Sequence, residues 1–183
     1  MDAASIAVVF LDLQEKIVTN SRTVTPQSIG IHAGVLAKLA KLHGIPVFLS
    51  GVPQGEAYLK DVLEPVGSPA PFFRTATTAF ADAKLIAEIR NTRRRTLILA
   101  GVASEIVVQR TALDGVAADF AVQVAVDACG GLNPRTEDAA WRRIVQAGGV
   151  TTSVTTLAAE LAGDFTTEIG GATLALMYET LAG

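Results

Sequence analysis

Short, unbroken runs of apolar residues alternate along this chain with longer segments of helical periodicity. The runs are rich in Val, Ile and Leu, which is typical of strands covered on both faces. Repeated strand–helix units require a parallel sheet with right-handed crossovers, so we expect an α/β fold, a Rossmann-like three-layer α/β/α sandwich with a six-stranded parallel sheet. The expected strands are residues 6–11, 46–50, 71–73, 96–100, 121–126 and 150–153. The expected helices are residues 26–43, 81–91, 104–119 and 136–147.

The size of the chain predicts one domain. Its 183 residues are 50% hydrophobic and 18% charged, the balance of a well-packed globular protein. No linker or internal repeat divides it, so residues 1–183 are expected to form a single domain with residues 164–183 as a C-terminal extension. The helix expected in that extension could close the core or dock onto another subunit, and its apolar surface favours a homo-oligomer.

Charge and cysteine content limit the partners and the location. A net charge of −3 and a pI of about 5.4 argue against nucleic acid or an anionic membrane as a partner. No run approaches the roughly 20 apolar residues of a membrane-spanning helix. The single cysteine, Cys129, fits a reducing compartment, so we expect a cytoplasmic protein. The basic run at residues 90–95 is interpreted as a solvated loop.

Three positions just beyond the predicted strands could carry chemistry, because parallel sheets bind ligands past the carboxyl ends of their strands. Asp12 directly follows an apolar strand that is expected to be buried, where a carboxylate is costly without a counter-ion or a functional role. It could instead cap a helix or hold a loop in place. Arg74 could hold Asp12 ionised or bind a substrate anion; it could also be a surface arginine packed on Phe72 or Phe73. The turn at residues 101–107 offers N–H groups at a helix start as an oxyanion site.

Four segments, "VVFLDLQ", "FFRTATTAF", "LILAGVASEIVVQRTALDG" and "VQVAVDACGG", resemble the isochorismatase-like, or cysteine hydrolase, superfamily. The later run "DACGGLNPRTEDAAWRRIVQAGGV" looks most like the YcaC-type subgroup of uncharacterised hydrolases. The resemblance covers nearly the whole chain. It implies a six-stranded parallel sheet, usually an oligomer, and cleavage of amide-type C–N bonds by an Asp, a Lys and a nucleophilic Cys.

Carried over by motif, the resemblance assigns roles to five residues. Asp12 matches the catalytic aspartate, and Arg74 stands where the family usually has lysine. Val102 and Ala103 match a turn that often contains a cis peptide bond, and the N–H groups of Ala103 and Val107 would line the oxyanion hole. Val107 itself occupies the position of the nucleophilic cysteine. A valine has no lone pair to attack with, so thiol catalysis at this position is excluded.

Three other sources of activity deserve comparison. Cys129 follows the fifth expected strand, but a packing role is favoured. Ser104 could attack if Glu105 acted as its base, yet a role as helix N-cap is favoured. True isochorismatases lack the cysteine and hydrolyse a vinyl ether with the aspartate as proton donor. However, they have glycine at the position of Val107 and keep the lysine. Gln14, Phe80 and Glu105 are further candidates to line the substrate.

A metal site or cofactor is not expected. Nicotinamidase-like relatives place an Asp and paired histidines after the second strand, whereas this chain has "FLSGVPQGEAY" there. His32 and His43 are expected on one helix, three turns apart and too far to share an ion, so both are interpreted as surface residues. The region 51–71 is expected to be a partly helical loop that covers the site. Two hypotheses follow: a hydrolase of small amides, esters or vinyl ethers, or a non-catalytic binding or assembly protein.

Overall fold

The sheet is six-stranded and entirely parallel, as expected. The computed structural model describes residues 1–182, without the side chain of Ala182. The strand order is β3-β2-β1-β4-β5-β6, so the order reverses between β1 and β4. Leu11 at the end of β1 lies opposite Ser50 of β2 and Gly101 of β4, which aligns three strand ends at one edge. The strands are β1 Ile6–Leu11, β2 Val47–Gly51, β3 Phe72–Phe73, β4 Thr96–Gly101, β5 Ala121–Ala125 and β6 Val150–Thr152.

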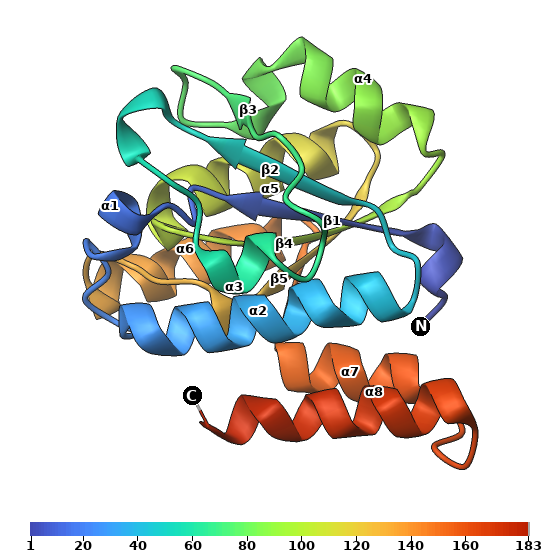
Figure 1. The fold of residues 1–183 in the computed structure, drawn as a ribbon. Helices are drawn as coiled ribbons and strands as arrows, with labels where there is room; N and C mark the ends of the chain where they lie inside the picture. Colours follow the sequence, from blue (N-terminus) through green and yellow to red (C-terminus); the bar gives the residue numbers. More distant parts are fainter. Residues whose placement is uncertain (183) are drawn as a thin grey trace.

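Helices cover both faces of the sheet (Figure 1). One face carries α2, and the other carries α4, α5 and α6. All six residues of β1 are buried, because this central strand is covered on both sides. None of the helices within residues 1–182 is long and apolar enough to cross a membrane. The helices are α1 Glu15–Val18, α2 Pro26–Leu42, α3 Lys60–Leu63, α4 Ala83–Asn91, α5 Gln109–Ala117, α6 Pro134–Gln146, α7 Val154–Ala162 and α8 Glu168–Glu179.

Helix starts differ from the expectation where a capping side chain decides them. Helix α4 begins two residues late because Asp82 accepts hydrogen bonds from the N–H groups of Lys84 and Leu85. Helix α6 begins two residues early, at Pro134, because Asn133 caps it and proline suits the first helical position. Helix α7 was not expected at all; Ser153 caps it.

The C-terminal helices α7 and α8 lie against each other outside α2 (Figure 1). The buried hydroxyl of Thr173 in α8 lies 2.7 Å from His43 Nε2 at the end of α2. Helix α8 therefore packs onto this subunit's own core, the first of the two roles considered for it. Phe165, which precedes α8, and Tyr178 within α8 remain exposed.

Both histidines are half-buried rather than on the surface, so that interpretation was wrong. Helix α8 partly covers His43, and this burial lowers the pKa of the imidazole. His32 Nδ1 lies 2.8 Å from the Ser28 carbonyl oxygen, and its Nε2 lies 3.9 Å from Asp127 Oδ2. Each ring thus joins α2 to another segment, which the sequence of one helix cannot reveal.

Candidate functional site

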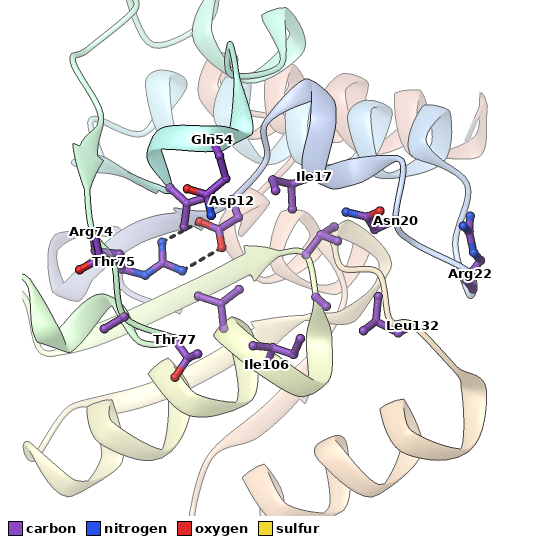
Figure 2. Close-up of a pocket in the computed structure, with 15 residues that line it drawn as sticks. Asp12, Ile17, Asn20, Arg22, Gln54, Arg74, Thr75, Thr77, Ile106 and Leu132 are labelled. Carbon is purple, nitrogen blue, oxygen red and sulfur yellow. Dashed lines mark hydrogen bonds and ion pairs between the residues drawn. The ribbon is translucent and has the colours of Figure 1, made fainter.

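A cavity of about 620 Å³ opens at the carboxyl edge of the sheet (Figure 2). Asp12, Arg74, Val102, Ala103 and Val107 all line it. These side chains come from the ends of β1, β3 and β4 and from the helical turn after β4. The structure therefore brings together the residues that follow three different strands.

Asp12 and Arg74 form a bidentate ion pair at the cavity (Figure 2). Arg74 Nη1 lies 2.7 Å from Asp12 Oδ1, and Nη2 lies 2.8 Å from Oδ2. Arg74 is only 5% exposed and Asp12 only 6% exposed. Two parallel bonds between charged groups are the strongest geometry for such a pair. Arg74 is therefore not a surface arginine, and its Nε atom is buried without an acceptor among the described residues.

Backbone geometry fixes the direction of the Asp12 side chain. Asp12 has a φ of +54°, a left-handed conformation that few residues other than glycine adopt and that Asp tolerates. Its N–H donates to the Ser50 carbonyl at 2.8 Å, which continues the sheet for one residue beyond β1. The Arg74 N–H donates to the Gly51 carbonyl at 3.0 Å. Sheet hydrogen bonds thus hold both partners.

Tyr58 supports this edge from the loop after β2, and sequence reasoning missed it. Its buried hydroxyl donates to the carbonyl oxygens of Phe10 and Ser50. Burial, followed by the nearby charge of Asp12, raises the pKa of Tyr58 well above its ordinary value. Tyr58 therefore stays a neutral donor that fixes the strand ends under the Asp12–Arg74 pair.

The turn after β4 has the unusual backbone that the resemblance implied. The peptide bond between Val102 and Ala103 is cis. Gly101 is required here, since a Cβ would overlap the Leu11 carbonyl oxygen. The segment Ser104–Val108 then forms a π-helical turn before α5, so the predicted helix is not regular at its start. This turn carries Ile106 and Val107 to the cavity wall.

Ser104 is not the N-cap that the sequence suggested. Ala103 occupies that position, and no side chain caps the turn. The buried Ser104 hydroxyl instead donates to Glu137 Oε1 at 2.7 Å. The Ser104 hydroxyl therefore bonds to α6 and not to the free N–H groups at the start of its own helix.

Gln14, Phe80 and Glu105 were expected near the substrate, but none lines the cavity. Gln14 is buried, and its amide bonds to Val52 and to the Glu56 carbonyl, which holds the loop after β2. The Phe80 ring packs edge-on against Phe120, with centroids 6.2 Å apart. Glu105 Oε1 accepts from the Leu132 N–H at 2.9 Å and from the Thr136 hydroxyl at 2.8 Å. All three have supporting rather than lining positions.

Several polar residues that line the cavity were not predicted from the sequence. Asn20 and Arg22 lie well beyond the end of β1, and Gln54 belongs to the loop that covers the site. Thr75 and Thr77 stand in the segment "FFRTATTAF", but the resemblance assigned neither of them a role. The loop at residues 51–71 is partly helical, as expected, and Val52 and Gln54 bring it to the cavity. The polar lining residues missed from the sequence are Asn20, Arg22, Gln54, Thr75 and Thr77.

Cys129 lies away from the cavity lining. It is completely buried, and burial raises the pKa of its thiol far above the ordinary range. Such a thiol is a packing residue in its present surroundings. Within residues 1–182, no three His, Cys, Asp or Glu side chains gather in a way that could hold a metal ion.

Comparison with known families agrees with this geometry. The isochorismatase domain model matches residues 6–156. The chain belongs to the isochorismatase family. It is 28% identical over 181 residues to the probable hydrolase YcaC of Escherichia coli K12, covering 93% of this chain and 84% of that protein.

Solved structures of YcaC share the whole fold. YcaC from Pseudomonas aeruginosa, determined with hexane-2,5-diol and covalent acrylamide, superposes with a TM-score of 0.90 at 25% identity. The alignment covers 100% of this chain and 93% of that one. Escherichia coli YcaC, described as an octameric hydrolase of unknown specificity, gives a TM-score of 0.89 at 26% identity, covering 98% and 89% of the two chains. The C-terminal helices are therefore part of the shared fold.

Proposed function

We propose that this isochorismatase-family protein binds a small molecule in the Asp12–Arg74 cavity and does not hydrolyse it through a thiol. One observation carries the proposal: an apolar side chain, Val107, lines the cavity at the position that the resemblance assigns to the nucleophile. Without an attacking atom there, no acyl-enzyme forms. The single thiol of the sequence, Cys129, is buried and does not line the cavity. A cytoplasmic location remains our prediction and rests on the cysteine content.

The ion pair itself favours binding over proton transfer. Both carboxylate oxygens of Asp12 accept a hydrogen bond from the same guanidinium. A general base must accept a proton on one of these oxygens, and the neutral acid that results would lose its ion pair with Arg74. A lysine has a single nitrogen and cannot occupy both oxygens in this planar geometry. Arg74 therefore holds the Asp12 carboxylate in a fork that the family's usual lysine could not form.

A second candidate is hydrolysis that uses Asp12 alone, as in the vinyl-ether chemistry of true isochorismatases. The exposure of Asp12 to the cavity favours it. The isopropyl group of Val107 occupies space that glycine leaves open in those enzymes. We rank this activity second because protonated Asp12 would lose its ion pair with Arg74.

Restoring the thiol tests the proposal. We expect Val107→Cys, in a Cys129→Ser background, to react with iodoacetamide much faster than Cys129 does in the parent protein, because the introduced thiol faces an open cavity near a helix start. Acrylamide is a second probe, since it is attached covalently to the Pseudomonas relative. Peptide mapping by mass spectrometry gives the labelled position. Faster reaction of Cys129 in the parent would mean that the nucleophile has moved.

We also infer that the protein self-associates. The octameric state of the E. coli relative supports this, together with exposed Phe165, Ile169, Tyr178 and Leu181 around α8. Light scattering in dilute solution should give a mass several times that of the chain. A mass near 19.0 kDa would contradict the inference.

A further inference from the structure

The cavity has one charged lining residue without a counter-ion. Three charged side chains line it: Asp12, Arg74 and Arg22. The first two neutralise each other through the bidentate pair. Within the part of the chain that the structure describes, no carboxylate lies within 4.0 Å of the Arg22 guanidinium. Its Nη1 atom donates to the Thr19 carbonyl oxygen at 3.3 Å. The net charge of the lining is therefore +1, in a protein whose net charge is −3.

Arg22 lies at the end of the cavity opposite Arg74 (Figure 2). Asn20 lies between Arg22 and the Asp12–Arg74 pair (Figure 2). An arginine fork and an amide donor match the two oxygens of a carboxylate. The unpaired positive charge of Arg22 is thus separated from the Asp12–Arg74 ion pair by the length of the cavity.

One wall between these two ends is apolar. Val107 is buried in it, while Ile106 and Leu132 are 44% and 42% exposed at its edge. Contact with a ligand would remove those two exposed side chains from water. At about 620 Å³, the cavity is within the usual range for a small-molecule site and has room for a ring-sized apolar group.

We propose that the ligand is a small apolar monocarboxylate, with its carboxylate on Arg22 and its apolar body on Ile106, Val107 and Leu132. This rests on the proposed function, because it names the ligand class of the same cavity. A dianion or a free phosphate fits less well, since Arg22 supplies one unpaired positive charge. Arg22 is then a specificity-determining residue, and Arg74 serves the ion pair instead of the ligand.

Titration calorimetry with phenylacetate and its neutral analogue phenylacetamide tests the proposal. Phenylacetate should bind the unmodified protein at least tenfold more tightly than phenylacetamide. Arg22→Gln should weaken phenylacetate at least tenfold and change phenylacetamide less than twofold, while Arg22→Lys should restore part of the loss. Arg90→Gln is the matched control, because it removes an exposed arginine from α4 and should change neither affinity. Inorganic phosphate should bind more weakly than phenylacetate.

Equal affinities for the acid and the amide would overturn the carboxylate proposal, as would no effect of Arg22→Gln or no binding of phenylacetate. Val107→Phe, which partly fills the cavity, separates this failure from that of the proposed function. If phenylacetate binding is lost in Val107→Phe but not in Arg22→Gln, the cavity binds small molecules and only the role of Arg22 is wrong. If binding survives both changes, the ligand lies elsewhere and the cavity assignment also fails. Circular dichroism checks that each variant is folded.

Discussion

Two ion pairs in this protein have similar chemistry and opposite surroundings. Asp12–Arg74 is buried at the carboxyl edge of the sheet, with both partners held by sheet hydrogen bonds. Lys38–Glu179 joins α2 to α8, and its side chains are 44% and 45% exposed. Water screens the second pair but not the first. Removing one partner of the buried pair would therefore leave an unpaired charge at the cavity. Each exposed contact between α2 and α8 contributes little stability by itself.

The largest expected effect comes from breaking the buried pair. Arg74→Met should lower the free energy of unfolding by about 3–5 kcal/mol, because it leaves the Asp12 carboxylate buried and unpaired. Denaturant unfolding measures the loss. The double variant Asp12→Asn/Arg74→Met is the control; it has no buried charge, and asparagine tolerates the left-handed backbone. It should be more stable than Arg74→Met alone, and a single variant that loses less than 1 kcal/mol would refute the comparison.

The contact between α2 and α8 should show an intermediate effect. The Thr173 hydroxyl donates to the Ile169 carbonyl at 2.7 Å and lies 2.7 Å from His43 Nε2. Thr173→Val keeps the shape of the side chain but leaves the imidazole N–H of His43 without its acceptor. The free energy of unfolding should therefore fall by about 1–2 kcal/mol. Thr173→Ser, which keeps the hydroxyl, is the matched control. Identical stabilities of the valine and serine variants would show that the hydrogen bond contributes nothing.

The same contact should make stability depend on pH. Burial lowers the pKa of His43 below its ordinary value of 6.5. As the pH falls through 6.5, the unfolded chain binds the proton first, so stability should fall until the pH drops below the pKa of the folded protein. His43→Gln should lose this part of the pH dependence. Unfolding curves at pH 7.5 and 5.5 for both proteins separate the contribution of His43 from that of other titrating groups. An equal loss of stability in the two proteins would contradict this prediction.

Much of the fold follows from the sequence alone. The six strands could be predicted because buried parallel strands are continuous apolar runs, and Asp12 and Arg74 stand out as charges directly after such runs. Helix α7 was missed because it follows a short strand without a glycine or proline to mark its start. The boundaries of α4 and α6 depended on Asp82 and Asn133, and either residue could also have been a loop residue.

The site could be predicted only in part, because pattern places residues at an edge without orienting their side chains. Gln14 and Glu105 have the right sequence positions, but both side chains turn into loops that they stabilise. Arg22 lies ten residues beyond Asp12 in an irregular segment, so nothing in the sequence links it to the cavity. Such contacts depend on the path of loops, which hydrophobic periodicity does not encode.

The smallest effect should come from the exposed pair. Lys38→Met and Glu179→Gln each remove one partner of the contact between α2 and α8. Both groups are hydrated in the folded and unfolded states, and holding two long side chains together has an entropic cost, so the coupling energy should lie below about 1 kcal/mol. A double-mutant cycle measured by denaturant unfolding gives this energy directly. The coupling should shrink further in 1 M NaCl, because salt weakens the interaction between solvent-exposed charges. A coupling above 2 kcal/mol that salt leaves unchanged would show that this pair is as shielded from solvent as Asp12–Arg74, and the contrast between the two regions would then be wrong.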